Sequence, residues 1–358
     1  MLRSVTLARL RPRFSLAAVV LAVLVAGVIV NGCKCFRGPV NASPGLRWWL
    51  FSNFGASKVC PEMLKRGMPL RLQERGPAVG RFFPATCTVD VDDSSQTIAV
   101  QFTGAGYAHT PVTRRVGFTA DAVVQFRPDF YMGEEDIYVW AKVNRIVNGP
   151  HFQLGYVENP LAAGAAATPL GTVANLFGNQ IVAGELTRGF TVLQNWDTDS
   201  KTFSLGIIQP PAKPHTPYNV SEDEVFTFVN ETVEVQYNGR DFMGPFEVVG
   251  SDQQLQVRMF LQGPAVDIMV VNRQIGDIWR DGYQRGQQMG PPPGPVLAGG
   301  ALQPGRELKT AYRLPPGQYF IVLDHTASAG TVNPPPTIPL NPLAPPATVS
   351  VAVQLGEY

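Results

Sequence analysis

The sequence predicts a mainly β protein, in which an N-terminal antiparallel sheet with one main helix is followed by a C-terminal β-sandwich. Composition is the first reason, because 35 Gly and 32 Pro make up about 19% of the 358 residues, against roughly 12% in an average protein. The second reason is a series of short runs that are rich in β-branched and aromatic residues and separated by turn residues. Hydrophobic residues make up 45% of the chain, which is enough to fill a core.

The N-terminal segment has the pattern of an export signal. Residues 1–15 contain four arginines and no acidic residue, and residues 16–30 form an unbroken apolar run. The run ends at Val30-Asn31-Gly32-Cys33, which resembles the bacterial lipoprotein signal, although Asn31 replaces the small residue usual at that position. The resemblance implies cleavage of residues 1–32, a palmitate-bearing lipid anchor on Cys33, and a location at the bacterial outer membrane. An uncleaved membrane anchor is the alternative, because a helix over residues 14–30 at about 1.5 Å per residue just spans a bilayer.

Charge restricts the class of partner. Without residues 1–32 the chain keeps 25 basic and 28 acidic residues, a formal charge of −3. No block of Lys or Arg remains, so we expect no nucleic acid partner. The expected partners are a membrane, reached through the N-terminal lipid or anchor, and a second protein of the cell envelope.

The four cysteines lie in the first quarter of the chain, at Cys33, Cys35, Cys60 and Cys87. If Cys33 carries a lipid, three thiols remain in an oxidising compartment, where one pair can form a disulfide. Cys60 with Cys87 is the favoured pair, because it would fix a Pro- and Gly-rich segment to the first strand. A bridge from Cys35 to either of these residues stays open.

The first domain is expected over residues 55–210. It follows a tether at residues 33–54, whose Trp48 and Trp49 either rest at the bilayer interface or pack on their own domain. A short helix is expected around residues 61–65, and apolar residues at the helical period predict the main helix over 170–186. The expected strands are residues 97–102, 116–126, 136–146, 152–157, 189–193 and 202–208. Short connections between most of them favour antiparallel pairing.

A Pro-rich hinge at residues 211–221 leads into a second domain over residues 222–358. Its expected strands are residues 225–229, 232–236, 246–249, 255–261, 266–272, 308–314, 318–323 and 349–354. Short strands with polar turns are typical of a two-layer β-sandwich. Two Pro-rich stretches, 286–305 and 332–347, are expected as surface loops, because Pro is excluded from central strands.

Three strings of this second domain resemble the bacterial pre-peptidase C-terminal domains. They are residues 244–248 (GPFEV), 265–271 (AVDIMVV) and 314–324 (LPPGQYFIVLD). The resemblance covers about a third of the chain and implies a jelly-roll-like β-sandwich that acts as an accessory or binding module. It supplies no site, because a fold does not define a function.

The sequence contains no local motif of a catalytic or cofactor site. It has no GxSxG elbow, HExxH helix, Walker A loop or EF-hand loop. Residues 104–109 (GAGYAH) are interpreted as a turn, and the acidic residues Asp90, Asp92 and Asp93 as a hairpin tip. The four histidines lie far apart in sequence, at His109, His151, His215 and His325. We therefore predict no catalytic residue, metal ligand or cofactor, and we do not expect an enzyme, although a site built from dispersed residues stays open.

Aromatic residues are dense along the strands of the first domain. These residues could line a groove for an apolar ligand, with the 170–186 helix as one wall, or fill the core of the sheet. The groove candidates are Tyr131, Tyr138, Trp140, Phe152 and Tyr156.

The leading functional hypothesis is a membrane-tethered, exported envelope lipoprotein that binds a partner or builds a surface assembly without catalysis. Long Pro-rich loops favour it, because such loops lose little entropy when they make contacts. The alternative is a periplasmic or surface carrier of a lipid or another apolar ligand, with the first domain as its container.

Overall fold

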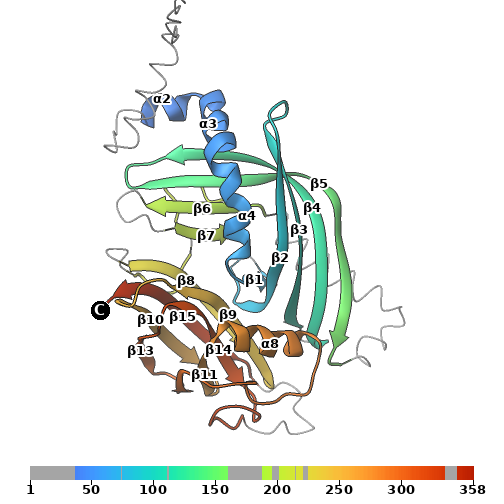
Figure 1. The fold of residues 1–358 in the computed structure, drawn as a ribbon, viewed down its shortest axis with the longest axis vertical. Coiled ribbons are helices and arrows are strands. Elements are labelled where there is room, and N and C mark those ends of the chain that lie inside the picture. The colour runs from blue at the N-terminus through green and yellow to red at the C-terminus, as the bar shows by residue number, and fades with distance from the viewer. Residues whose placement is uncertain are drawn as a thin grey trace, which may run out of the picture.

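The computed structural model describes residues 37–73, 75–110, 113–159, 188–195, 201–213, 215–220, 225–334 and 345–358. It is mainly β, as predicted, with one long helical segment near the N-terminus and a C-terminal β-sandwich (Figure 1). Residues 1–32, Cys33 and the helix predicted over 170–186 lie outside the described residues.

Most of the residues that were expected to form a tether are helical. The helical segment consists of α2 (Arg37–Ala42), α3 (Pro44–Leu50), the π-helical turn η2 (Phe51–Gly55) and α4 (Ala56–Leu64). Ser43 begins α3 by accepting a hydrogen bond from the Leu46 amide at 3.3 Å, and Arg47 pairs with Asp129 of the sheet at 2.6 Å. Phe51 is buried in the core beneath. Residues 37–54 are therefore part of the folded domain, and the short helix expected around 61–65 corresponds to the end of α4.

The N-terminal half of the sheet is an antiparallel meander, as predicted. Its strands are β1 (Met68–Arg71), β2 (Ala78–Asp92), β3 (Thr97–Thr110), β4 (Arg114–Met132), β5 (Asp136–Val157), β6 (Phe190–Asn195) and β7 (Lys201–Leu205). Each pairs antiparallel with the next. The two strands expected over 136–146 and 152–157 are one strand, β5, whose register against β4 shifts at several points.

Residues 104–109 lie inside β3 and do not form a turn. The glycines are needed because aromatic rings cover the backbone there. A Cβ atom at Gly104 would lie 2.6 Å from Cζ of Phe82, and one at Gly106 would lie 2.7 Å from Cζ of Phe118. The predicted turn is therefore wrong, because the same glycines that favour turns also admit close side-chain packing on a strand.

The C-terminal half has two packed layers. Its elements are β8 (Val225–Val235), β9 (Gly239–Val248), β10 (Gln253–Gln262), β11 (Val266–Asn272), α8 (Arg273–Gln284), β12 (Ala298–Leu302), β13 (Glu307–Tyr312), β14 (Gly317–His325) and β15 (Ala347–Glu357). Strands β13, β10, β15 and β8 form one layer, and the four-stranded sheet β12-β11-β14-β9 forms the other. Buried Val, Leu, Ile, Met and Phe side chains fill the space between them.

Three details of this half differ from the prediction. Strand β8 is continuous where two strands were expected, and β12 lies inside the stretch expected as a loop over 286–305. Helix α8 was not predicted. Asn272 begins it, because its Oδ1 accepts a hydrogen bond from the Ile275 amide at 2.9 Å.

The two halves share one sheet. β2 lies beside β8 through a single parallel pair, Ala78 with Val233, so the 11-stranded sheet contains strands of both halves. A separate aromatic core holds α8 against both, with Tyr107 of β3, Phe242 of β9 and Tyr283 of α8 in mutual ring contact. The halves therefore pack on each other over the described residues.

Candidate ligand-binding cavity

A cavity of about 700 Å³ opens where the two halves meet. Its lining comes from α4, β1, β6 and β8, and from residues 206–220, which connect β7 to β8; these elements can be followed in Figure 1. The connection includes the expected hinge, and it is fixed to the sandwich. Tyr218 donates a hydrogen bond to the Ser350 carbonyl at 3.2 Å, and the Asn230 side chain bonds both the amide and the carbonyl of Tyr218.

Apolar side chains form much of the wall. They come from elements that lie far apart in sequence, so no single run of residues predicts this apolar wall. The apolar lining residues include Met63, Met68, Val192, Leu193, Ile207, Ile208, Phe228 and Val229.

A buried ion network closes one side of the cavity. Arg81 is 1% exposed; its Nη2 lies 2.7 Å from Oδ2 of Asp241 and 2.6 Å from Oε1 of Glu231. Burial by itself lowers the pKa of Arg81, but the two carboxylates outweigh it and raise that pKa, so the guanidinium stays charged. Tyr107 donates a hydrogen bond to Oδ1 of Asp241 at 2.8 Å.

Two further cations of the lining have carboxylate partners. Arg71 lies 3.3 Å from Glu231, and Lys213 lies 3.3 Å from Asp136. These pairs neutralise charge on the cavity wall.

Arg66 differs from these cations. Its guanidinium donates a hydrogen bond to the Phe228 carbonyl and lies 5.6 Å from the centre of the Phe228 ring. Among the described residues no carboxylate lies within 4.0 Å of it. Burial lowers the pKa of Arg66, and the more distant charges of Glu62 and Glu231 oppose this only in part. The cavity wall therefore contains a partly buried cation that no carboxylate of the described residues contacts within 4.0 Å.

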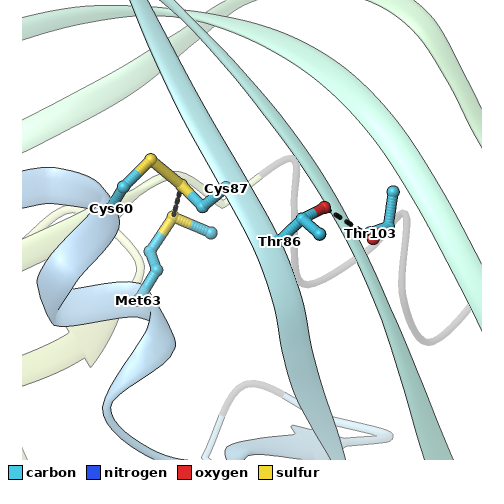
Figure 2. Close-up of a disulfide and its surroundings, with 5 residues drawn as sticks. All are labelled: Cys60, Met63, Thr86, Cys87 and Thr103. Carbon is cyan, nitrogen blue, oxygen red and sulfur yellow. Dashed lines mark hydrogen bonds between the residues drawn. A yellow bond between two sulfur atoms is a disulfide. The ribbon is translucent and has the colours of Figure 1, made fainter.

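The disulfide holds the α4 wall of the cavity in place. Cys60 on α4 is bonded to Cys87 on β2, with a Cα–Cα distance of 5.3 Å (Figure 2). This is the favoured member of the pairings that the sequence leaves open. Met63, which lines the cavity, lies one helical turn further on, with its sulfur 4.0 Å from that of Cys87.

The five aromatic groove candidates are not brought together. None of them lines the cavity. Tyr131 and Tyr138 are register partners on β4 and β5, Phe152 contacts Phe118 in the core, and Tyr156 packs on the Arg115 guanidinium. Trp140 lies opposite Asp129. Their density therefore reflects contacts along the length of the long strand β5.

The histidines are equally dispersed. His109 is buried, and its Nδ1 lies 3.4 Å from the Val79 carbonyl, which can only accept, so Nε2 of the neutral ring accepts a hydrogen bond from the Tyr283 hydroxyl at 3.0 Å. His151 lies at the surface beside Asp121. His215 is on the cavity lining, and His325 is buried at the end of β14.

The acidic tip between β2 and β3 is held by hydrogen bonds within the turn and by one from Trp48 to Asp93. Hydrogen bonds from Ser94 and Ser95 to Asp92 lower the pKa of that carboxyl to about 2. Within the described ranges, no three His, Cys, Asp or Glu residues are placed to hold a metal ion.

The lining cations were missed at the sequence level, although a signal was present. Three lining cations, Arg66, Arg71 and Arg75, lie within ten residues of sequence, with the apolar residues Met68, Leu70 and Leu72 between them. This pattern places cations beside apolar surface, as a site for an acidic amphiphile requires.

Comparison with known proteins gives no assignment: neither protein-family models nor curated proteins match the chain. In the part of the chain that the structure describes, every helix is too short or too polar to cross a bilayer.

Proposed function

We propose that the protein is a membrane-tethered, exported envelope protein that binds, without chemistry, a ligand with an apolar body and an acidic head. The observation that carries this proposal is the cavity with Arg66 in its wall. It favours the carrier hypothesis, with a container at the junction of the two halves instead of within the first one.

The size and lining suit a small amphiphile. Small-molecule sites measure roughly 300–1,000 Å³, and this cavity is lined in nearly equal measure by apolar and polar side chains, as a ligand with an apolar body and a polar head requires. A volume of about 700 Å³ falls inside that range. The apolar walls supply the driving force for an acyl or similar chain.

Arg66 supplies the selectivity. A partly buried arginine without a contacting carboxylate gains most from an incoming anion, because part of its desolvation cost is already present in the empty protein. A carboxylate or phosphate head therefore binds there better than a neutral head of the same size.

The tether rests on the sequence. The basic segment, the apolar run and Val30-Asn31-Gly32-Cys33 support export and lipidation of Cys33 in a bacterial envelope. The four residue-to-residue steps from Cys33 to Arg37 reach about 14 Å at most, so the folded part starts close to the membrane.

A matched pair of ligands tests this function. The full chain is titrated with a long-chain fatty acid and with the fatty alcohol of the same chain length, and binding is read from native mass spectra. We expect the acid to bind more tightly than the alcohol, and Arg66→Gln to abolish the difference. Arg285→Gln, an exposed change directly after the end of α8, serves as control. Equal binding of acid and alcohol by the unchanged protein would refute the role of Arg66, and binding of neither would refute the carrier function.

One observation favours the second candidate, an assembly protein. Strand β12 is at the edge of its sheet, contains no charged residue, and is preceded by the exposed Val296 and Leu297. Uncharged edge strands pair readily with a strand of another chain. If the protein assembles through β12, Gly300→Lys should convert the assembly to monomers in native gels and leave ligand binding unchanged.

A further inference from the structure

We propose that Leu46, Trp49 and Phe54 form a membrane-contacting face, which rests in the interface of the bilayer that holds the N-terminal anchor. This inference depends on the proposed tether, but not on the cavity.

The face consists of apolar side chains that the fold leaves uncovered. Leu46, Trp49 and Phe54 are 37%, 36% and 57% exposed. The rings of Trp49 and Phe54 meet edge to face with centroids 5.9 Å apart, so they form one cluster across the boundary of α3 and η2. Leu46 lies one helical turn before Trp49 and extends the cluster along α3.

Trp48 is a natural internal comparison. Its ring packs against Phe51 at 6.3 Å, and its Nε1 donates a hydrogen bond to Asp93 at 2.9 Å. Two adjacent tryptophans therefore have different roles: Trp48 packs on its own domain, and Trp49 is left facing outward.

The charge around the face permits contact with lipid. The first acidic residue of the chain is Glu62, so α2, α3 and η2 contain no carboxylate. Asp129 of β4 accepts a hydrogen bond from Arg47, and Asp93 in the turn between β2 and β3 accepts one from Trp48. Contact with the headgroups therefore buries no unpaired acid of α2, α3 or η2.

Chain length selects the bilayer over other occupants. Only three residues separate Cys33 from α2, and α3 begins immediately after Ser43. A lipid on Cys33 therefore keeps the face near the membrane surface at all times, whereas a partner protein must be recruited. Tryptophan also favours the membrane–water interface, where its ring is in an apolar region and its N–H stays hydrated.

The test measures fluorescence quenching of the full chain in vesicles whose phospholipids carry bromine near the headgroup end of the acyl chains. Bromine quenches tryptophan only on close approach. We expect quenching relative to unbrominated vesicles, loss of most of it in Trp49→Phe, and its retention in Trp48→Phe.

The outcomes separate this inference from the tether. If the protein floats with the vesicles and Trp49→Phe is quenched as strongly as the unchanged chain, the membrane-contacting face is wrong while the tether holds. If the protein does not float, the tether fails, and the face fails with it. If Trp49 is unquenched and the protein is dimeric in native mass spectra until Phe54→Ser is introduced, a second copy covers the face and the proposal is overturned.

Discussion

Arg81 of β2 and Asp241 of β9 are joined by a buried ion pair, with both carboxylate oxygens 2.9 Å from the Arg81 Nε atom. The two residues are 160 positions apart, and they connect the N-terminal half of the sheet to the sandwich. The pair also fixes the wall of the cavity, because Arg81 is a lining residue. Stability and the shape of the binding site are therefore coupled at this point.

Asp241→Asn tests that coupling. Removing one charge of a buried pair leaves the other partly uncompensated, and the expected loss is about 3 kcal/mol of unfolding free energy. Denaturation in urea measures it. Asp281→Asn, which disrupts an exposed pair with Arg285 at the end of α8, should cost no more than about 0.5 kcal/mol. Equal losses in the two variants would contradict the assignment.

The disulfide should stabilise the α4 wall. A bridge that closes 27 residues removes chain entropy worth about 3.5 kcal/mol from the unfolded state. The double variant Cys60→Ser/Cys87→Ser is expected to lose about that amount in urea denaturation. An unchanged midpoint and slope would show that α4 stays docked without the bridge.

The glycines of β3 give a steric prediction. Gly104→Ala places a methyl group 2.4 Å from the Phe83 carbonyl oxygen and should destabilise the protein by about 1–3 kcal/mol. Gly300→Ala on β12 is the matched control, because its Cβ would meet nothing within 4 Å. Thermal unfolding of the two variants distinguishes them, and a stable Gly104→Ala variant would contradict the packing of Phe82 over this strand.

His109 predicts a dependence of stability on pH. Burial, assisted by the positive charge of Arg115, lowers the pKa of His109 to about 4, from 6.5. The unfolded chain therefore takes up a proton at a higher pH than the folded one. Stability from this group is fully present above pH 6.5, falls as the pH drops, and is lost below about pH 4. The expected loss is about 3 kcal/mol.

Denaturation of the unchanged protein and of His109→Gln between pH 7 and pH 4 isolates this effect. The His109→Gln variant should lose less stability than the unchanged protein as the pH falls, by the amount that the titration of His109 contributes. Parallel stability curves for the two proteins would mean that His109 titrates normally in the fold.

Several strands were predictable because runs of β-branched and aromatic residues are a local sequence pattern. The runs of β4, β10 and β14 stand between turn residues, and each was expected near its observed place, whereas only the first half of β3 was expected as a strand. The part of β2 before Cys87 was missed because Gly80 and Pro84 interrupt it, although Gly80 is required there by the Tyr107 carbonyl, 2.1 Å from where its Cβ would be. The sequence around Gly80 does not reveal that β3, which carries Tyr107, lies beside it.

The helices were harder to predict. Gly276 and Gly282 weaken the local signal of α8, yet Gly276 lets the helix approach Phe320, whose ring lies 2.2 Å from where a Cβ would be. Helix α3 begins with Pro44 and Gly45, which were interpreted as loop residues. In both cases tertiary packing overrides local propensity.

The cavity was not predictable, because long-range contacts assemble it. Arg66, Lys213 and Phe228 come from three segments that meet only when β2 lies beside β8. Aromatic density in β5 was the stronger local signal, and it reports packing of a long strand. A site of this kind becomes visible in sequence only through its alternation of basic and apolar residues.

The most direct test of the central claim is the intact mass of the full chain, extracted in detergent and measured first under native and then under denaturing conditions. We expect a lipid on Cys33 in both spectra, and a further mass, that of an acidic lipid-sized ligand, in the native spectrum alone. That additional mass should be lost in Arg66→Gln and kept in Arg285→Gln. A lipidated chain with no additional mass, which also fails to take up added fatty acid, would contradict the proposed binding function.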